Sequence, residues 1–406
     1  MMSVSLNMFM TLAVAVIVLL IGAWLRKKVK ILDKFCIPAP VVGGLLYALV
    51  MTVFHVFGIL DLEYDDTLKD VCMVAFFTTV GFQVDFKALK KGGKSLLLLT
   101  ILVLVLIIAQ NFLSLGVSAL IGVDSLLGLC TGSIPMVGGH GTAGAFGPIL
   151  EDFGMKSATT ICTAAATFGL VAGSLIGGPL GNNLIKRHKL YDQANKDSGG
   201  DVATKEIETQ ENKEEPEENF SSKGYATATY QVAIAMGIGT IISWALSKAG
   251  LTLPMYIGGM IIAVIMRNVG DRTKKVNIAS KEIGALGDVA LSMFLGIAMI
   301  TLKLWQLADL AVPFLILLAC QTVLMIIYAY FVVFNVMGRD YDAAVLTSGM
   351  CGFGMGATPN AMANMQAITR KYGPSLKAFL IVPIVGGMFV DFMNSMTITV
   401  FINFLT

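Results

Sequence analysis

The sequence predicts an all-α polytopic membrane protein with about ten transmembrane helices, arranged as two inverted five-helix repeats that each carry a glycine-rich re-entrant hairpin. Three observations lead to this prediction. Apolar residues make up 56% of the chain and charged residues 14%, whereas about a quarter of the residues in a soluble domain are charged. The charged residues cluster between long apolar segments. Two glycine-rich stretches occupy corresponding places in the two halves, and glycine-interrupted membrane segments of this kind come in pairs in repeat-built membrane proteins.

Ten apolar segments are drawn as membrane spans, since about 20 apolar residues cross the hydrocarbon core. The first segment has no basic residue before it and is too long for a cleaved signal peptide, so it counts as a span. The seventh is short for a span. The segments are residues 4–25, 38–58, 70–86, 95–121 and 158–185 in the first half, and 226–247, 253–266, 282–302, 311–336 and 375–404 in the second.

The distribution of basic residues predicts the orientation, because cytoplasmic loops are rich in Lys and Arg. With the N-terminus outside, the inside loops hold 25 of the 29 basic residues. The acidic run at 61–66 then falls outside. We therefore expect both termini outside the cytoplasmic membrane.

Residues 186–224 form the one long polar segment, with ten acidic residues and few apolar ones. Such a composition cannot bury enough apolar surface to fold, so we interpret this segment as a disordered cytoplasmic linker. It separates a first repeat at 1–185, with a hairpin near 125–150, from a second repeat at 225–406, with a hairpin near 342–366.

The two halves resemble each other at a nearly constant spacing. Gly43 pairs with Gly258 at an offset of 215 residues, and the glycine-rich stretches align at an offset of 217. Five spans in each half is an odd number, so the second half starts from the opposite side of the membrane. The repeats are therefore expected to be inverted, with hairpins entering from opposite faces and meeting near the midplane. This geometry is typical of a secondary transporter that works by alternating access.

The six cysteines are scattered, with no CxxC or Cys/His spacing, so neither a disulfide framework nor a zinc site is expected. We expect no cofactor and no metal site built from cysteine or histidine.

Several motifs make the chain similar to a known family. They include Gly-Gly-His-Gly-Thr at 138–142, Cys-Gly-Phe-Gly-Met-Gly-Ala-Thr-Pro-Asn-Ala at 351–361 and Ala-Asn-Met-Gln-Ala-Ile-Thr at 363–369, with Tyr-Asp-Ala-Ala-Val at 341–345 and Ile-Pro-Ala-Pro-Val at 37–41. The chain resembles the bacterial sodium–glutamate symporters over nearly its whole length except the linker. At one position the family pattern has Thr where this chain has Asn360.

The resemblance implies an inner-membrane carrier, not an enzyme, that takes up L-glutamate with sodium. It also implies two inverted halves with re-entrant loops, a homodimer and an elevator-like movement. The partners expected are glutamate, sodium, the lipid bilayer and a second copy of the chain, with no nucleic acid.

Glutamate carries two carboxylates, which helix N-termini can bind without a buried arginine. The glycine-rich turns lead into such half-helices, and a proline suits the first helical turn. Packing of small residues explains the glycines equally well. The candidate substrate-binding residues are Ser133, Gly139, His140, Gly141, Thr142, Thr358, Pro359, Asn360 and Asn364.

His140 is the histidine placed at membrane depth, where it serves as a substrate ligand or proton carrier, or else as a structural hydrogen-bonding group. Asp391 is the acid deepest within a predicted span, and intramembrane carboxylates are usually functional. It coordinates sodium or the substrate ammonium in the functional interpretation, and pairs with Asn394 or Ser395 in the structural one. The candidate sodium-binding residues are Asp391, Gly354, Gly356 and Asn394.

Gln110 and Gln321 occupy similar positions in the fourth and ninth spans, where they line the pathway or join helices by hydrogen bonds. The glycines at 352–356 lack the Lys-Ser/Thr of a nucleotide-binding loop. An intramembrane enzyme would need a catalytic pair that the sequence does not offer convincingly, and a passive channel fits poorly with two opposed hairpins. The close alternative is a carrier of another carboxylate, such as a di- or tricarboxylate, or one coupled to protons.

Overall fold

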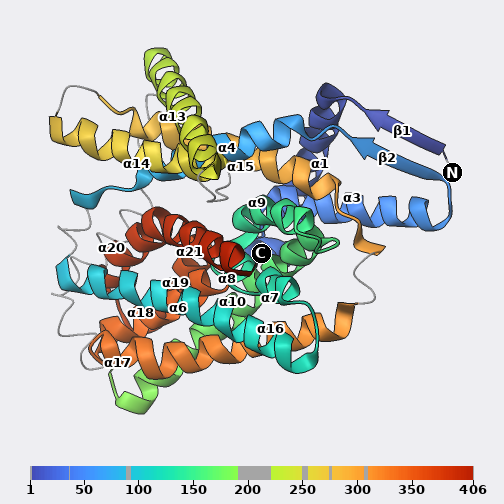
Figure 1. The fold of residues 1–406 in the computed structure, drawn as a ribbon. Coiled ribbons are helices and arrows are strands. Elements are labelled where there is room, and N and C mark those ends of the chain that lie inside the picture. Colours follow the sequence, from blue (N-terminus) through green and yellow to red (C-terminus); the bar gives the residue numbers. More distant parts are fainter. Residues whose placement is uncertain are drawn as a thin grey trace.

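The computed structural model describes residues 2–35, 37–87, 93–190, 221–248, 255–273, 277–305 and 310–405. Helices dominate these ranges (Figure 1). In the first half they are α1 (Met8–Lys28), α2 (Lys30–Lys34), α3 (Ala39–Val56), α4 (Thr67–Gln83), α6 (Gly93–Ile121), α7 (Ser125–Thr131), α8 (Ser133–Met136), α9 (Gly139–Asp152) and α10 (Ala158–His188). In the second half they are α13 (Ser222–Lys248), α14 (Met255–Thr273), α15 (Ser280–Ile300), α16 (Ala311–Ile327), η2 (Tyr328–Val333), α17 (Phe334–Val336), α18 (Tyr341–Gly354), α19 (Thr358–Tyr372), α20 (Leu376–Ile384), η3 (Val385–Phe389) and α21 (Val390–Leu405).

Each of the ten predicted spans coincides with a helix or a continuous helical run. Within the described ranges, eight of these are long and apolar enough to cross a membrane. The other two predicted spans correspond to α4, which has 17 residues, and α14, which has 19 and carries charged residues in its last turns. The protein is therefore a helical, multi-pass membrane protein.

The N-terminal segment differs from the prediction of a helix from residue 4. Residues Met2–Leu6 form strand β1, which pairs in parallel with β2 (Leu60–Tyr64). Helix α1 begins after Asn7, whose side chain accepts hydrogen bonds from the amides of Phe9 and Met10. An asparagine in this capping position sets the start of the helix. The regular structure of the described ranges is thus helical apart from one two-stranded sheet.

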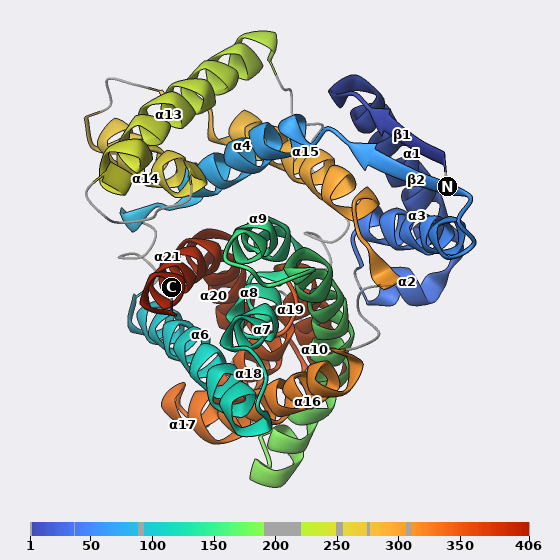
Figure 2. The ribbon, with the colours of Figure 1, turned by 45° about the vertical axis from the view of Figure 1, so that its right-hand side comes forward.

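The helices separate into two bundles (Figure 2). We call α1, α3, α4, α13, α14 and α15 the arc bundle, because these helices form a curved layer. We call α6–α10 and α16–α21 the hairpin bundle. Each bundle draws helices from both halves of the sequence, and α9 lies at the edge of the hairpin bundle that faces the arc bundle (Figure 2).

Close helix packing in the arc bundle depends on paired glycines. A Cβ atom at Gly43 of α3 would lie 2.0 Å from the Val18 carbonyl oxygen of α1. In the second half, a Cβ atom at Gly258 of α14 would lie 2.0 Å from the Gly239 carbonyl oxygen of α13. Only glycine permits these approaches. The two positions are the ones that the sequence comparison of the halves had paired.

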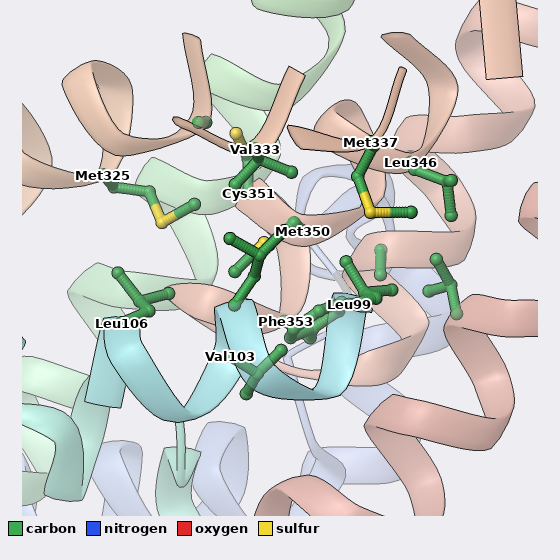
Figure 3. Close-up of a cluster of buried hydrophobic side chains, with 14 of the residues drawn as sticks. Leu99, Val103, Leu106, Met325, Val333, Met337, Leu346, Met350, Cys351 and Phe353 are labelled. Atoms are coloured by element: carbon green, nitrogen blue, oxygen red, sulfur yellow. The ribbon is translucent and has the colours of Figure 1, made fainter. Parts of the chain in front are cut away.

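Most of the core of the hairpin bundle consists of apolar side chains that pack without polar partners. Leu99, Val103 and Leu106 of α6 pack against Met350 and Phe353 of α18 (Figure 3). The same cluster extends to α16 and η2. This core fixes α18, and with it the second hairpin, to the long membrane helices.

Candidate functional site

Both glycine-rich stretches form broken helices, which we call the first and second hairpins, and the breaks, or tips, lie against each other. The first hairpin runs through α7, α8 and α9, with breaks at Gly132 and Gly138. The second runs through α18 and α19, with a break between Gly354 and Thr358. At the contact, Gly139 has φ +58°, and a Cβ atom there would lie 3.0 Å from the Gly356 carbonyl oxygen. Both features favour glycine, because a side chain there would be strained and tightly packed.

The second half-helix of each hairpin begins at this contact without a side-chain cap. Helix α9 starts after Gly138 and α19 after Ala357, and neither N-cap residue makes a side-chain capping bond. Pro359 lies in the first turn of α19, as expected from its fixed φ angle. Backbone N–H groups at the start of a helix have no partner within the helix, so both starts attract negative groups.

A cavity of about 220 Å³ lies where the tips meet the arc bundle. Eight of the predicted site residues line it: Gly139, His140, Gly141, Thr142, Gly356, Thr358, Pro359 and Asp391. The arc bundle contributes apolar side chains, among them Phe76 of α4 and Leu291 and Leu295 of α15. The cavity therefore lies between the two bundles and is closed by residues from both.

Asp391 reaches the cavity from an irregular stretch of helix. Pro383 and the π-helical turn η3 precede it, and Gly386 within that turn also lines the cavity. A Cβ atom at Gly386 would lie 2.8 Å from the Thr358 hydroxyl oxygen, so this turn packs directly on the start of α19. π-Helical turns occur frequently at functional sites. In the described part of the chain, the Asp391 carboxylate has neither a hydrogen bond nor an ion pair.

The protonation of His140 follows from its partner. Its Nε2 atom lies 3.0 Å from the Thr167 hydroxyl oxygen, and that hydroxyl donates its single proton to the Thr163 carbonyl oxygen at 3.0 Å. When the Thr167 hydroxyl donates to Thr163, its oxygen accepts from His140, and this arrangement corresponds to the tautomer with the proton on Nε2. In the neutral ring, Nδ1 is then an acceptor for a ligand group.

Two predicted asparagines lie outside the cavity lining and attach the second hairpin to α10. Asn360 donates to the Leu170 carbonyl oxygen at 2.9 Å and to the Ser174 hydroxyl oxygen at 2.7 Å. Asn364 donates to the Gly173 carbonyl oxygen at 3.0 Å. Both side chains are buried. Their position indicates a structural contribution, and their role in substrate binding stays a prediction.

Ser133 and Asn394 also lie outside the cavity lining, in a polar network beside it. The backbone N–H of Ser133 donates a hydrogen bond to Asn111 Oδ1 at 2.9 Å. In return, Asn111 Nδ2 donates to the Ser133 hydroxyl oxygen at 2.9 Å. Asn394 donates to the Ser133 carbonyl oxygen at 3.1 Å, which leaves its own Oδ1 buried without a partner. A Cβ atom at Gly138, which lines the cavity, would lie 2.6 Å from Asn394 Nδ2. The network therefore lies directly behind the cavity wall.

The last predicted residue, Gly354, is held by the fourth span. Gln110 Nε2 donates to the Gly354 carbonyl oxygen at 2.8 Å, and Gln321 Nε2 donates to the Gln110 carbonyl oxygen at 2.8 Å. Of the two roles considered for these glutamines, the structure shows the interhelical hydrogen bonds. The lining residues Phe76, Leu291 and Leu295 were missed by the sequence reasoning, because an apolar side chain in an apolar helix gives no signal of its own.

Comparisons with known proteins show which family the chain is similar to. A family model described as sodium/glutamate symporter matches residues 4–374. The sodium/glutamate symporter of Escherichia coli (strain K12) is 39% identical over 398 residues, covering 98% of each chain. That of Haemophilus influenzae is 38% identical over 397 residues, covering 97% of this chain and 96% of the relative.

Proposed function

From the premise that the chain belongs to the sodium/glutamate symporter family, we propose that it catalyses sodium-coupled uptake of L-glutamate by alternating access. Its relatives are named as symporters, not enzymes. Sodium is then a co-substrate and not a resident cofactor. The observation that carries the proposal is the cavity where two hairpin tips meet between two bundles, beside an unpaired carboxylate.

We place the glutamate carboxylates at the starts of α9 and α19. Thr142 and Thr358 line the cavity there, and neither hydroxyl has a hydrogen bond within the described ranges. The uncapped N–H groups and the two hydroxyls supply donors without a cationic side chain. His140 Nδ1 supplies an acceptor, which suits the substrate ammonium.

We place sodium at Asp391, with oxygen atoms from the hairpin tips and from Asn394 as further ligands. An unpaired carboxylate at membrane depth is costly, and a cation offsets that cost. The Gly356 carbonyl lies at the tip contact, and the Asn394 Oδ1 atom is buried without a partner. The Gly354 carbonyl already accepts from Gln110 and has one further lone pair to offer.

Reciprocal packing supports the proposal of inverted repeats. Gly44 of α3, in the first half, packs against Met299 of α15, in the second half. Conversely, Gly259 of α14, in the second half, packs against Thr78 of α4, in the first half. The second span of each half thus packs against the third span of the other half. A pseudo-two-fold axis in the membrane plane relates such contacts.

We further propose an elevator-like movement of the hairpin bundle against the arc bundle in a homodimer, with both termini outside. Apolar contacts at the interface support this movement, among them Phe146 of α9 packed edge-on to Tyr256 of α14, with ring centroids 5.7 Å apart. Apolar surfaces can slide without leaving hydrogen-bonding groups unpaired. The distribution of Lys and Arg supports the orientation.

The test is uptake of labelled L-glutamate into proteoliposomes under an inward sodium gradient or an equal potassium gradient. We expect accumulation with sodium alone. Thr142→Val and Thr358→Val should lower kcat/KM by about ten-fold or more, since each removes a donor to a buried carboxylate. Thr322→Val is the matched control, because the Thr322 hydroxyl bonds to its own helix in α16. Normal transport by both cavity variants would contradict the proposed site.

The alternative is another carboxylate cargo or proton coupling. Competition by malate or citrate, with no glutamate accumulation, would favour the first. Glutamate accumulation that follows a proton gradient without sodium would favour the second.

A further inference from the structure

A second hollow, of about 410 Å³, opens between the same two bundles, away from the central cavity. Lys303, which follows α15, is one of its lining residues, and we call it the Lys303 hollow. The hairpin bundle lines it with the end of α9 and the start of α10, and the arc bundle with the start of α4 and the end of α15. Its volume falls in the range of small-molecule sites.

The Lys303 hollow and the central cavity lie along one seam between α9 and α15. On α9, Gly141 lines the central cavity and Pro148 lines the hollow. On α15, Leu295 lines the central cavity and Ala298 lines the hollow. Gly144 lies between Gly141 and Pro148 on α9 and also lines the hollow. The Phe294 ring of α15 packs on it, and a Cβ atom there would lie 2.8 Å from the ring. This ring contact therefore lies on the seam, at the end of the hollow nearer the central cavity.

The hollow holds two unpaired charges of opposite sign on facing walls. Asp152 ends α9 of the hairpin bundle, and Lys303 follows α15 of the arc bundle. Neither has an ion pair or hydrogen bond within the described ranges. The other charges there are engaged, because Lys69 pairs with Asp66 and Glu151 accepts from the Thr159 amide at 3.0 Å.

Two adjacent threonines in the first turn of α10 also line the hollow. Thr160 is 4% exposed as a residue, and its hydroxyl makes no hydrogen bond within the described part of the chain. The neighbouring Thr159 hydroxyl is buried without a partner, which is unfavourable unless a ligand or water supplies one. The start of α10 adds the favourable end of a helix dipole for an anionic group.

We propose that the Lys303 hollow is a docking site for a zwitterionic acidic amino acid, occupied before transfer to the central cavity. Lys303 and the Thr160 hydroxyl bind a carboxylate, and Asp152 binds the ammonium, so the ligand bridges the two bundles. The proposal rests on the proposed glutamate transport and adds to it a second, outlying site. Displacement of the Phe294 ring from Gly144 then lets the ligand pass from the Lys303 hollow to the central cavity.

The test uses full-length protein in proteoliposomes and measures the initial rate of glutamate uptake at saturating sodium. Lys303→Glu and Asp152→Lys should each raise KM about five-fold, the effect of losing one exposed ion pair, with kcat within about two-fold of the wild type. The double variant Lys303→Glu/Asp152→Lys keeps both charges with their places exchanged, and its KM should return to within about two-fold of the wild type. Lys156→Glu changes a charge on a different hollow and is the control.

An unchanged KM in both single variants overturns the docking site. A double variant no better than the single variants overturns the bridging geometry. Added choline chloride should reduce the KM difference, since exposed charges are screened by salt. If the wild type itself fails to accumulate glutamate under a sodium gradient, the proposed function fails. If the wild type accumulates glutamate and the variants have the same KM as the wild type, only the proposal of the docking site is overturned.

Discussion

Replacing Asp391 by asparagine should have opposite effects on stability and on transport. The Asp391 carboxylate lines the central cavity without a hydrogen bond or ion pair in the described part of the chain. An aspartate at the centre of a membrane helix costs about 2.5–3.5 kcal/mol in insertion measurements. Water in the 220 Å³ cavity offsets part of that cost. We therefore expect Asp391→Asn to stabilise the sodium-free protein by about 1–2 kcal/mol.

The assay is thermal unfolding of purified protein in detergent, with and without sodium. Without sodium, the variant's Tm should lie roughly 1–4 °C above that of the wild type. With sodium at ten times its Kd, the wild type should gain about 1.4 kcal/mol, as mass action requires, and the variant should gain nothing. Sodium-driven glutamate uptake by the variant should be lost.

Asp288→Asn is the matched control, because Asp288 lies on α15 with an exposed side chain. It should change neither the sodium-dependent Tm shift nor uptake. An Asp391→Asn protein that still gains stability from sodium and still accumulates glutamate would refute the assignment of Asp391 as a sodium ligand.

Three further substitutions test the packing and the hairpins. Gly239→Ala should lower Tm strongly, because its Cβ would lie 2.1 Å from the Gly259 amide, whereas Gly237→Ala, two residues away with nothing within 4 Å, should be neutral or slightly stabilising. Gln110→Leu leaves the Gly354 carbonyl without its donor and should cost about 1–3 kcal/mol in thermal unfolding; an unchanged Tm would show that water replaces the amide. Gly139→Ala places a side chain on a residue with φ +58°, at the contact between the two tips. Glutamate uptake should fall by about ten-fold or more, while the protein still elutes as folded material in size-exclusion chromatography. Normal uptake would mean that the tips need not touch.

The sequence predicted the membrane helices well because their signal is local. An apolar run of sufficient length has few alternatives in a bilayer, and eight of the predicted spans correspond to helices of the described ranges that are long and apolar enough to cross a membrane. The first residues were misassigned because the strand Met2–Leu6 depends on pairing with Leu60–Tyr64, more than 50 positions away. Hydropathy carries no information about such a pairing.

The candidate site could be predicted only in part, because helical phase decides which residues of a motif face the cavity. Thr358 lines it, whereas Asn360, two positions later on α19, points to α10. Two residues along a helix lie about 200° apart around its axis. The motif therefore located the tip, but it could not separate ligand-facing residues from those that hold the tip in place.

The division between polar and apolar contacts supports movement of the hairpin bundle as one unit. Within that bundle, buried amides join both hairpins to the long helices, through Asn111 and Ser133, Gln110 and Gly354, and Asn364 and the Gly173 carbonyl. Breaking such bonds in a dry interior would leave polar groups unpaired, at about 1–3 kcal/mol each.

Between the bundles the contacts are of a different kind. Phe294 packs on Gly144 and Phe146 on Tyr256. A hydrogen bond from Asn360 to the Phe35 carbonyl, in the turn between α2 and α3, is long at 3.4 Å. Exchange of one such ring contact for another breaks no hydrogen bond, and the buried Tyr256 hydroxyl has no partner to lose within the described ranges. The central cavity lies between the bundles, so in the proposed movement the surface that slides is also the surface that closes over the ligand. Mutations that add a buried hydrogen bond across the seam, and not those that remove one within the hairpin bundle, are therefore the ones expected to slow transport while raising stability.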